Sequence, residues 1–309
     1  SHLRSQPVST PFPIIDAHHH LWDLTSGRYP WLQDEIIPTF RYGDYSSICH
    51  NYLPAEFRQD NNRQNVVASV HMEAEWSTDD PVAETDWLHR VAEADGVPSA
   101  IIGQAWFCRD DINTLLAGHA AYPLIRGIRQ KPVAAATQDQ VISGAPGTMS
   151  DPKFREGYAI MAKHSLHYDL QVPWWHLEEA RDLARDFPDT LIILNHTGLP
   201  SDRSERSLLG WRAGMEALAD VANTAVKISG IGMPGEAWTV ELNRNIVLTT
   251  IAIFGVERCM FASNFPVDSL VASYDTIFDG FREITKEFGQ SAQRKLFHDN
   301  AKRYYRIDT

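Results

Sequence analysis

Cysteine, long apolar runs and positive charge are all scarce in this chain of 309 residues. Its three cysteines, Cys49, Cys108 and Cys259, are widely spaced and include no CxxC pair. An odd set of this kind predicts a reducing, cytoplasmic compartment rather than a disulfide framework. No apolar run approaches the roughly 20 residues that a transmembrane helix needs, so we expect no membrane span.

The shortage of positive charge narrows the choice of partners. Lys and Arg number 28 against 40 Asp and Glu, which gives a formal net charge of −12. No basic stripe offsets this charge, so we expect neither nucleic acid nor an anionic membrane as a partner. A small-molecule substrate is expected instead, and an anionic one would need only one or two well-placed arginines. The sequence is compatible with a homodimer.

Short β-forming runs alternate with helical patterns from end to end, in a composition that is 43% hydrophobic and 22% charged. Apolar strands that alternate with helices are typical of a parallel sheet. Eight such units in about 300 residues predict a closed (β/α)8 barrel of the TIM type. The expected strands are Ile14–His19, Val66–Glu73, Ala100–Phe107, Ile125–Arg129, Tyr168–Val172, Leu191–Asn195, Ala225–Ser229 and Cys259–Ala262.

Helix caps and apolar spacing place several helices between these strands. The expected helices run from Asp80-Pro81 to Gly96, over Lys153–Ser165 after Asp151-Pro152, over His176–Phe187, from Thr239 to Phe254, and over Ser291–Arg306 as an extra C-terminal helix. No linker divides the chain, so we expect one domain over residues 13–309. Residues 1–12 are expected to be disordered or tag-derived, with Ser1-His2 as a cloning scar.

Two connections, residues 21–65 and 131–150, are too long to be plain turns. Both leave the C-terminal end of a strand, which is the side where barrels of this kind build their active sites. Long loops in compact domains are usually lids or binding loops. We therefore expect these two segments to cover the site, with a purely structural cap as the alternative.

The motif Ile14-Ile15-Asp16-Ala17-His18-His19-His20 ends the first expected strand. Because strand side chains alternate between faces, His18 and His20 share one face, with Asp16 behind them, and His19 points the other way. Two imidazoles at a strand end can hold a metal ion or polarise a carbonyl group.

Charged residues end the second and fourth strands. By the same alternation His71, Glu73 and Glu75 share a face, and Glu75 could join the imidazoles. Arg129 ends the fourth strand, where its fork of donors suits a substrate carboxylate or a developing oxyanion. The alternative for Arg129 is a structural ion pair with Glu75.

An imidazole and several tryptophans complete the candidate site. His196 follows the apolar run of the sixth strand, so a rigid support carries it to the mouth of the barrel. Trp22, Trp76 and Trp174 follow the first, second and fifth strands, where aromatic side chains can wall a ring-shaped substrate. They are the expected substrate-binding aromatics.

These motifs together resemble the amidohydrolase superfamily of the amidohydrolase-2 type. The resemblance covers residues 13–304 and includes Asp16-Ala17-His18-His19-His20-Leu21-Trp22, His196, Val226-Lys227-Ile228-Ser229-Gly230, Met260-Phe261-Ala262-Ser263-Asn264-Phe265-Pro266 and the C-terminal Phe297, Asn300-Ala301 and Arg303-Tyr304. Within that superfamily, the sequence is similar to the group that includes L-fuconolactonase, L-rhamnonolactonase, 4-sulfomuconolactonase and 2-pyrone-4,6-dicarboxylate lactonase.

The resemblance implies a hydrolase that opens a lactone or related carboxylic ester of sugar-acid or aromatic catabolism. His18, His20 and His196 take the positions of the family's strand-end histidines, and Arg129 falls where some lactonases bind a substrate carboxylate. Most members carry Asp where this chain has Asn264, and an amide cannot accept a proton. The identity of the general base is therefore undecided between Glu75 and His196. Asp268 is a further candidate for substrate binding.

The sequence leaves one cofactor question and two other functions open. One weakly bound zinc or manganese ion on His18, His20 and Glu75 is one expectation, and a metal-free mechanism is the other. A non-oxidative decarboxylase of the same superfamily is the second enzymatic function, which Asn264 disfavours. The third alternative is a ligand-binding barrel that has lost its catalytic base.

Overall fold

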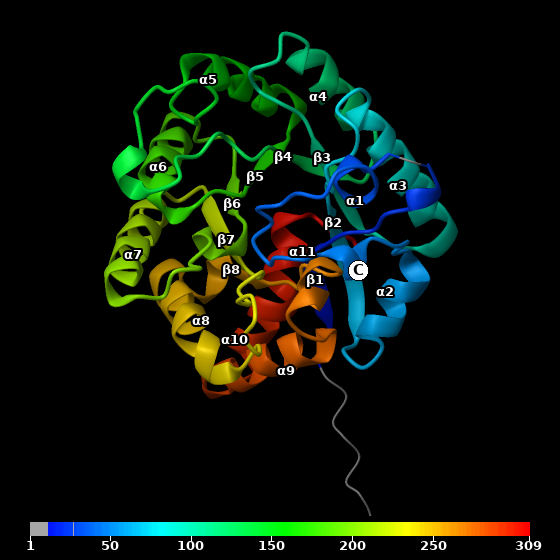
Figure 1. The fold of residues 1–309 in the computed structure, drawn as a ribbon, viewed down its shortest axis with the longest axis vertical. Coiled ribbons are helices and arrows are strands. Elements are labelled where there is room, and N and C mark those ends of the chain that lie inside the picture. Colours follow the sequence, from blue (N-terminus) through cyan, green and yellow to red (C-terminus); the bar gives the residue numbers. More distant parts are fainter. Residues whose placement is uncertain (1–11, 27) are drawn as a thin grey trace, which may run out of the picture.

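A single sheet of eight parallel strands organises the computed structural model, which describes residues 12–26 and 28–309. The strands pair in chain order, as Figure 1 shows. Their bounds are β1 Ile14–His19, β2 Val66–Met72, β3 Ala100–Gln104, β4 Ile125–Arg129, β5 His167–Leu170, β6 Ile192–Leu194, β7 Thr224–Ile228 and β8 Cys259–Phe261.

The sheet closes on itself where β1 meets the segment after β8. His19 forms a parallel bridge with Phe265. The His20 backbone N–H donates to the Phe265 carbonyl at 2.7 Å, and the Asn264 N–H donates to the His18 carbonyl at 2.8 Å. Closure leaves no open sheet edge, which confirms the expected (β/α)8 barrel.

Helices surround the strands in a ring (Figure 1). Two of them begin at expected caps, since the Asp151 and Thr239 side chains accept backbone N–H groups. Asp80 makes no such bond at the start of α3, but Gly96 ends that helix in a left-handed conformation. The α-helices are α1 Pro30–Gln33, α2 Pro54–Asn61, α3 Pro81–Asp95, α4 Ile112–Ala120, α5 Pro152–Tyr158, α6 Leu177–Asp186, α7 Glu205–Ala219, α8 Val240–Phe254, α9 Tyr274–Thr285, α10 Gln290–Arg294 and α11 Asn300–Tyr304.

Two expected helices are divided. The helix predicted over Lys153–Ser165 is α5 followed by a 3₁₀ segment, Ala159–His164. The predicted C-terminal helix is α10 and α11 with a π-helical stretch, Lys295–Asp299, between them.

The C-terminal segment fills the interior of the barrel at the N-terminal ends of the strands. Ala301, Tyr305 and Ile307 pack with inward apolar side chains such as Ile15 and Val70. Arg126, near the start of β4, donates to the Tyr305 carbonyl at 2.7 Å. Figure 1 shows α11 across the middle of the strand ring. This end of the barrel is therefore sealed, and the opposite mouth is the place for a site.

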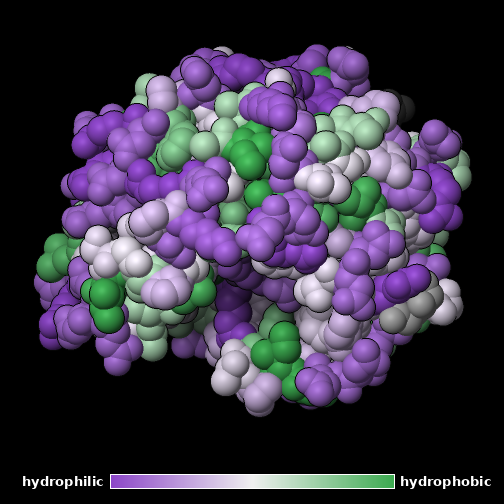
Figure 2. Space-filling view, turned by 90° about the horizontal axis from the view of Figure 1, so that it is seen from above, coloured by the Kyte–Doolittle hydropathy of each residue, from purple (hydrophilic) through white to green (hydrophobic). Residues whose placement is uncertain are grey.

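Among the described residues, no helix is long and apolar enough to cross a membrane. On the face in Figure 2, hydrophobic residues form small separated groups among hydrophilic ones. The N-terminal segment expected to be tag-derived falls, apart from Phe12, outside the described residues.

Candidate active site

The strand ends surround a cavity of about 280 Å³ at the C-terminal mouth of the barrel. Residues at or just after the ends of six strands line it: His20, Ala74, Glu75, Arg129, Lys131, Gln171, His196, Asn264 and Val267. The 21–65 segment supplies the remaining wall, with Trp31, Ile37, Thr39, Phe40 and Arg41. The structure thus brings the expected strand-end residues together under the first long loop. The other long loop contributes only Lys131.

His20 and His196 line this cavity, and the fully buried ring of His18 lies beside both. The ring centroid of His18 is 5.3 Å from that of His20 and 4.7 Å from that of His196. His20 Nδ1 lies 2.8 Å from the Met72 carbonyl oxygen. A carbonyl only accepts, so Nδ1 carries the proton and His20 Nε2 is the basic nitrogen of the neutral ring.

The environment keeps all three imidazoles neutral. Burial lowers the pKa of His18, His20 and His196 well below the usual value for histidine. Positive neighbours lower these pKa values further, because a second positive charge close by is unfavourable. Lys227 acts on His18, Arg129 on His20 and Arg41 on His196.

His196 is oriented by one polar contact and by a strained backbone. Its Nδ1 lies 2.8 Å from the Ser229 hydroxyl oxygen. Its φ is 55°, a left-handed value that is uncommon outside glycine. Glu75 and Asn264 have φ values of 55° and 54°. Strained residues at three strand ends around one cavity are typical of a functional site.

His19 and Asp16 have structural roles. The His19 ring stacks on Phe57 at 4.1 Å and contacts the Ser69 hydroxyl, so it faces away from the cavity as expected. Asp16 accepts hydrogen bonds from the Ser263 N–H and hydroxyl and from Tyr274. These bonds join β1 to the segment after β8 and to α9.

Arg129 pairs with Glu73, which corrects the expected partner. Its Nε lies 2.8 Å from Glu73 Oε1, and the two side chains are 4% and 2% exposed. It also donates to the Glu73 carbonyl and to Gln171 Oε1. Glu75 instead pairs with Lys131 at 3.1 Å, and this positive neighbour lowers the pKa of Glu75. The strict alternation predicted over residues 71–75 fails because β2 ends at Met72 and the backbone turns at Glu75.

Asp268 lies behind Asn264 rather than in the cavity wall. The Asn264 Nδ2 group donates to Asp268 Oδ1 at 2.8 Å, and only Asn264 lines the cavity. Burial raises the pKa of Asp268 to about 6, against the opposing effect of Arg41. The prediction that Asp268 contacts substrate is therefore not supported by its position.

Comparison with known proteins agrees with this arrangement. The family model described as amidohydrolase matches residues 15–307. The chain belongs to the amidohydrolase family.

Relatives of this amidohydrolase match over nearly their whole lengths. The protein y4mH of Sinorhizobium fredii is 45% identical over 294 residues, which is 95% of this chain and 98% of that protein. An L-fucono-1,5-lactonase of Burkholderia ambifaria is 26% identical, with 95% and 96% covered. A zinc-bound amidohydrolase structure from Burkholderia multivorans has a TM-score of 0.78 at 22% identity, with 96% and 99% covered.

The three tryptophans expected to wall the substrate of this amidohydrolase lie outside the lining of the cavity. Trp22 is buried and donates to the His50 carbonyl, with its ring stacked near His20 at 6.1 Å. Trp76 packs edge-on against Tyr29, and Trp174 packs against α7 at Gly210 and Gly214. None of the three tryptophans lines the cavity. Of the three, Trp22 packs directly against the lining residues His20 and Trp31.

Trp31 and Arg41 are two of the lining residues that sequence reasoning missed. Trp31 Nε1 donates to the Ala74 carbonyl, and Arg41 Nη1 donates to the Gly230 carbonyl at 2.7 Å. These bonds attach the 21–65 segment to the segments after β2 and β7. The only sequence signal was the length of the segment and its aromatic content.

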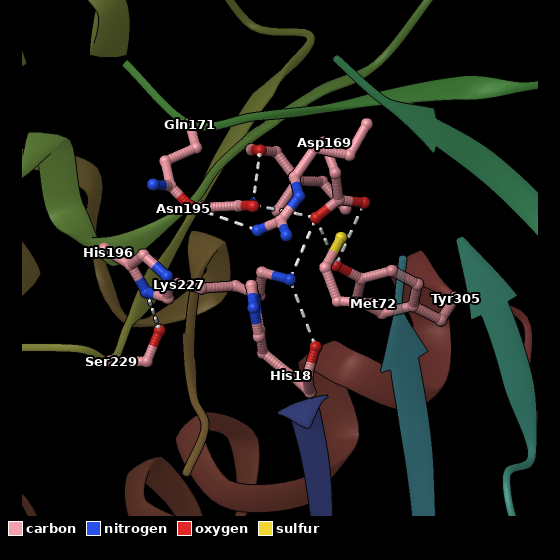
Figure 3. Close-up of polar contacts among 12 residues, drawn as sticks. His18, Met72, Asp169, Gln171, Asn195, His196, Lys227, Ser229 and Tyr305 are labelled. Atoms are coloured by element: carbon pink, nitrogen blue, oxygen red, sulfur yellow. Dashed lines mark hydrogen bonds and ion pairs between the residues drawn. The ribbon is translucent and has the colours of Figure 1, made fainter. Parts of the chain in front are cut away.

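A buried charged cluster beneath the imidazoles was also missed (Figure 3). Lys227 Nζ lies 2.9 Å from Asp169 Oδ1, and both side chains are fully buried. His167, Asn195 and Tyr305 also donate to Asp169. Burial lowers the pKa of Lys227 to about 8. A lysine inside the apolar run Ala225-Val226-Lys227-Ile228 was the available signal, because such a group is buried only with a partner.

His18, His20 and Glu75, the expected metal ligands, do not form a three-ligand site, although the two imidazoles are neighbours. Within residues 12–26 and 28–309, no three His, Cys, Asp or Glu side chains are placed to share a metal ion. Glu75 forms an ion pair with Lys131. The imidazoles lie near the positive charges of Arg41, Arg129 and Lys227. Anionic ligands attract a divalent cation, whereas positively charged side chains close by repel it. The present arrangement does not fit the three-ligand site expected on His18, His20 and Glu75.

Proposed function

We propose that this amidohydrolase hydrolyses a lactone to the open hydroxy acid. The observation that carries the proposal is the placement of neutral imidazoles opposite fixed cationic donors in one cavity. Ester hydrolysis needs a base for the attacking water and donors for the developing oxyanion. The relation to an L-fucono-1,5-lactonase over nearly the whole chain supports a lactone as the substrate.

In the proposed reaction His196 takes a proton from water as the water oxygen bonds to the lactone carbonyl carbon. Arg129 has five N–H donors, three of which bond to Glu73 and Gln171. The others, together with Arg41, stabilise the oxyanion. When the ring C–O bond breaks, the imidazolium of His196 returns the proton to the leaving alkoxide. Water is consumed, and no other reactant is needed.

The test is acid release from a panel of sugar-acid lactones and muconolactones in a pH-stat. The wild-type protein should release one acid per lactone opened. His196→Asn should reduce turnover by about 10²–10⁴-fold, the usual contribution of a general base. An exposed His50→Asn variant is the matched control. Carbon dioxide released from a hydroxybenzoate would indicate a decarboxylase, and binding without turnover would indicate a ligand-binding barrel.

We infer that the protein's own groups carry this reaction without a bound metal ion. The ligand geometry and the positive charge around the imidazoles support this inference. Prolonged treatment with a chelator should leave turnover unchanged, with metal content checked by elemental analysis. Activity that is lost on chelation and restored by zinc or manganese would contradict it.

A further inference from the structure

Asn264 and Asp268 form a buried pair at the base of the cavity. Asn264 lines the cavity, whereas Asp268 is 1% exposed and lies behind it. The Asn264 Nδ2 group donates to Asp268 Oδ1 at 2.8 Å, and the Asp268 backbone N–H donates to the Asn264 carbonyl at 2.9 Å. The Asn264 backbone N–H in turn donates to the His18 carbonyl. The amide is thus fixed at both its backbone and its side chain.

The chemistry of this pair determines which way the amide faces. An ionised carboxylate only accepts hydrogen bonds, so the group that faces Asp268 must be the NH2 of Asn264. The amide oxygen is then left on the side of the cavity, where His20 and His196 also lie. A protonated Asp268 could instead donate to the amide oxygen, and the NH2 group would turn toward the cavity. The charge on Asp268 therefore determines whether Asn264 offers the cavity an acceptor or a donor.

The groups around Asp268 allow both states near neutral pH. Arg41 and Tyr42 face it from the 21–65 segment, the Gly230 backbone faces it from the segment after β7, and Asn264 faces it from its own segment. Burial raises the pKa of Asp268 to about 6, while the hydrogen bonds and Arg41 oppose that rise. The three imidazoles of the site have pKa values well below the usual value. Asp268 is therefore a group beside the cavity whose charge is expected to change around pH 6.

We propose that Asp268 is a positioning residue that, when ionised, holds the oxygen of the Asn264 amide toward the attacking water. An acceptor there orients the water so that its second proton points to His196. Protonation of Asp268 removes this acceptor, and turnover falls. The proposal rests on the proposed lactone hydrolysis for the identity of the water, but the orientation of the amide can be measured without it.

The kinetic test compares the wild-type protein with three variants between pH 5 and 8. Wild-type kcat should fall below about pH 6. Asp268→Asn should lose about 10–100-fold in kcat, the usual effect of one hydrogen bond to a charged group, with KM little changed and no inflection near pH 6. Asn264→Ala should show a similar loss. The exchanged variant Asn264→Asp/Asp268→Asn should recover most of the loss, because position 264 again presents an oxygen.

A second measurement does not depend on turnover. In protein labelled with [¹⁵N]asparagine, the Asn264 side-chain NH2 signal is identified by its loss in Asn264→Ala. It should shift with a midpoint near pH 6 in the wild-type protein and show no such midpoint in Asp268→Asn. The exposed Asp220→Asn variant is the control and should behave as wild type in both experiments.

The outcomes separate this proposal from the proposed function. A midpoint near pH 6 that depends on Asp268 supports the positioning role, even if the wild-type protein opens no lactone and the proposed function fails. The proposal is overturned if the amide signal shows no such midpoint. It is also overturned if a folded Asp268→Asn protein, judged by its urea midpoint, hydrolyses lactones with the wild-type kcat and pH profile.

Discussion

Arg129 and Glu73 form an ion pair at 2.8 Å in which both side chains are almost fully buried. A buried charge without its partner is strongly unfavourable, whereas an exposed pair contributes little. Arg129 therefore has a structural role in addition to the proposed contact with the oxyanion. At the scale of single residues, burial determines which charged groups of this site contribute to the stability of the fold.

Arg129→Ala should destabilise the fold by about 3–5 kcal/mol, because Glu73 would remain buried without a partner. The exposed pair of Lys131 and Glu75 provides the matched control. Lys131→Ala should cost less than about 1 kcal/mol. Urea unfolding followed by circular dichroism measures both changes. Equal stability of Arg129→Ala and wild type would show that the pair does not support the fold.

At the scale of elements, the C-terminal segment after α11 completes the barrel. Tyr305 is fully buried among the inward side chains, and its hydroxyl donates to Asp169 at 3.0 Å. Asp169 in turn pairs with Lys227, which contacts the carbonyl of Ala17 in β1. A chain of contacts thus runs from the C-terminus to the strand that carries His18.

Tyr305→Ala should cost about 3–5 kcal/mol, because it leaves a large cavity inside the barrel. Tyr305→Phe keeps the ring and should lose about 1.5–3 kcal/mol, because the lost hydrogen bond goes to the charged Asp169. The neighbouring Tyr304 is half-buried, so Tyr304→Ala should change stability much less. Urea unfolding midpoints rank the three variants. The segment would not be part of the core if Tyr304→Ala and Tyr305→Ala were equally stable.

At the scale of the whole molecule, buried ionisable groups should make stability depend on pH. A histidine with a lowered pKa takes up its proton in the unfolded chain first, so stability is lost as pH falls below about 6.5. Among the described residues, six buried histidines have a lowered pKa and act in this direction: His18, His19, His20, His71, His119 and His196. Three acids with raised pKa values have the opposite sign: Asp16, Glu84 and Asp268.

The histidines outnumber these acids, so the unfolded chain should bind more protons between about pH 6.5 and 4.5. We expect the urea midpoint to fall steadily over that range at constant ionic strength. The pKa of His71 is lowered to about 3, so His71→Leu should make the dependence shallower. A midpoint that stays constant or rises on acidification would show that the acids dominate.

Much of the fold could be predicted from the sequence, because strands and helices are recognised by local periodicity and by caps. The bounds of β1 and β4 agree with those expected, and Gly96 ends α3 as its left-handed conformation requires. His20 and His196 were found for the same reason, since each directly follows a segment whose pattern predicts a strand. The order of residues along the chain was sufficient for these conclusions.

Only the tertiary structure decided which side chains meet. Arg129 pairs with Glu73 rather than Glu75 because the backbone turns at Glu75. Arg41 and Trp31 line the cavity because the 21–65 segment packs across the mouth, and local periodicity says nothing about the path of such a segment. Contacts between distant elements depend on packing in three dimensions, so the sequence alone determined where the strands end but not which charges, rings and amides face one another there.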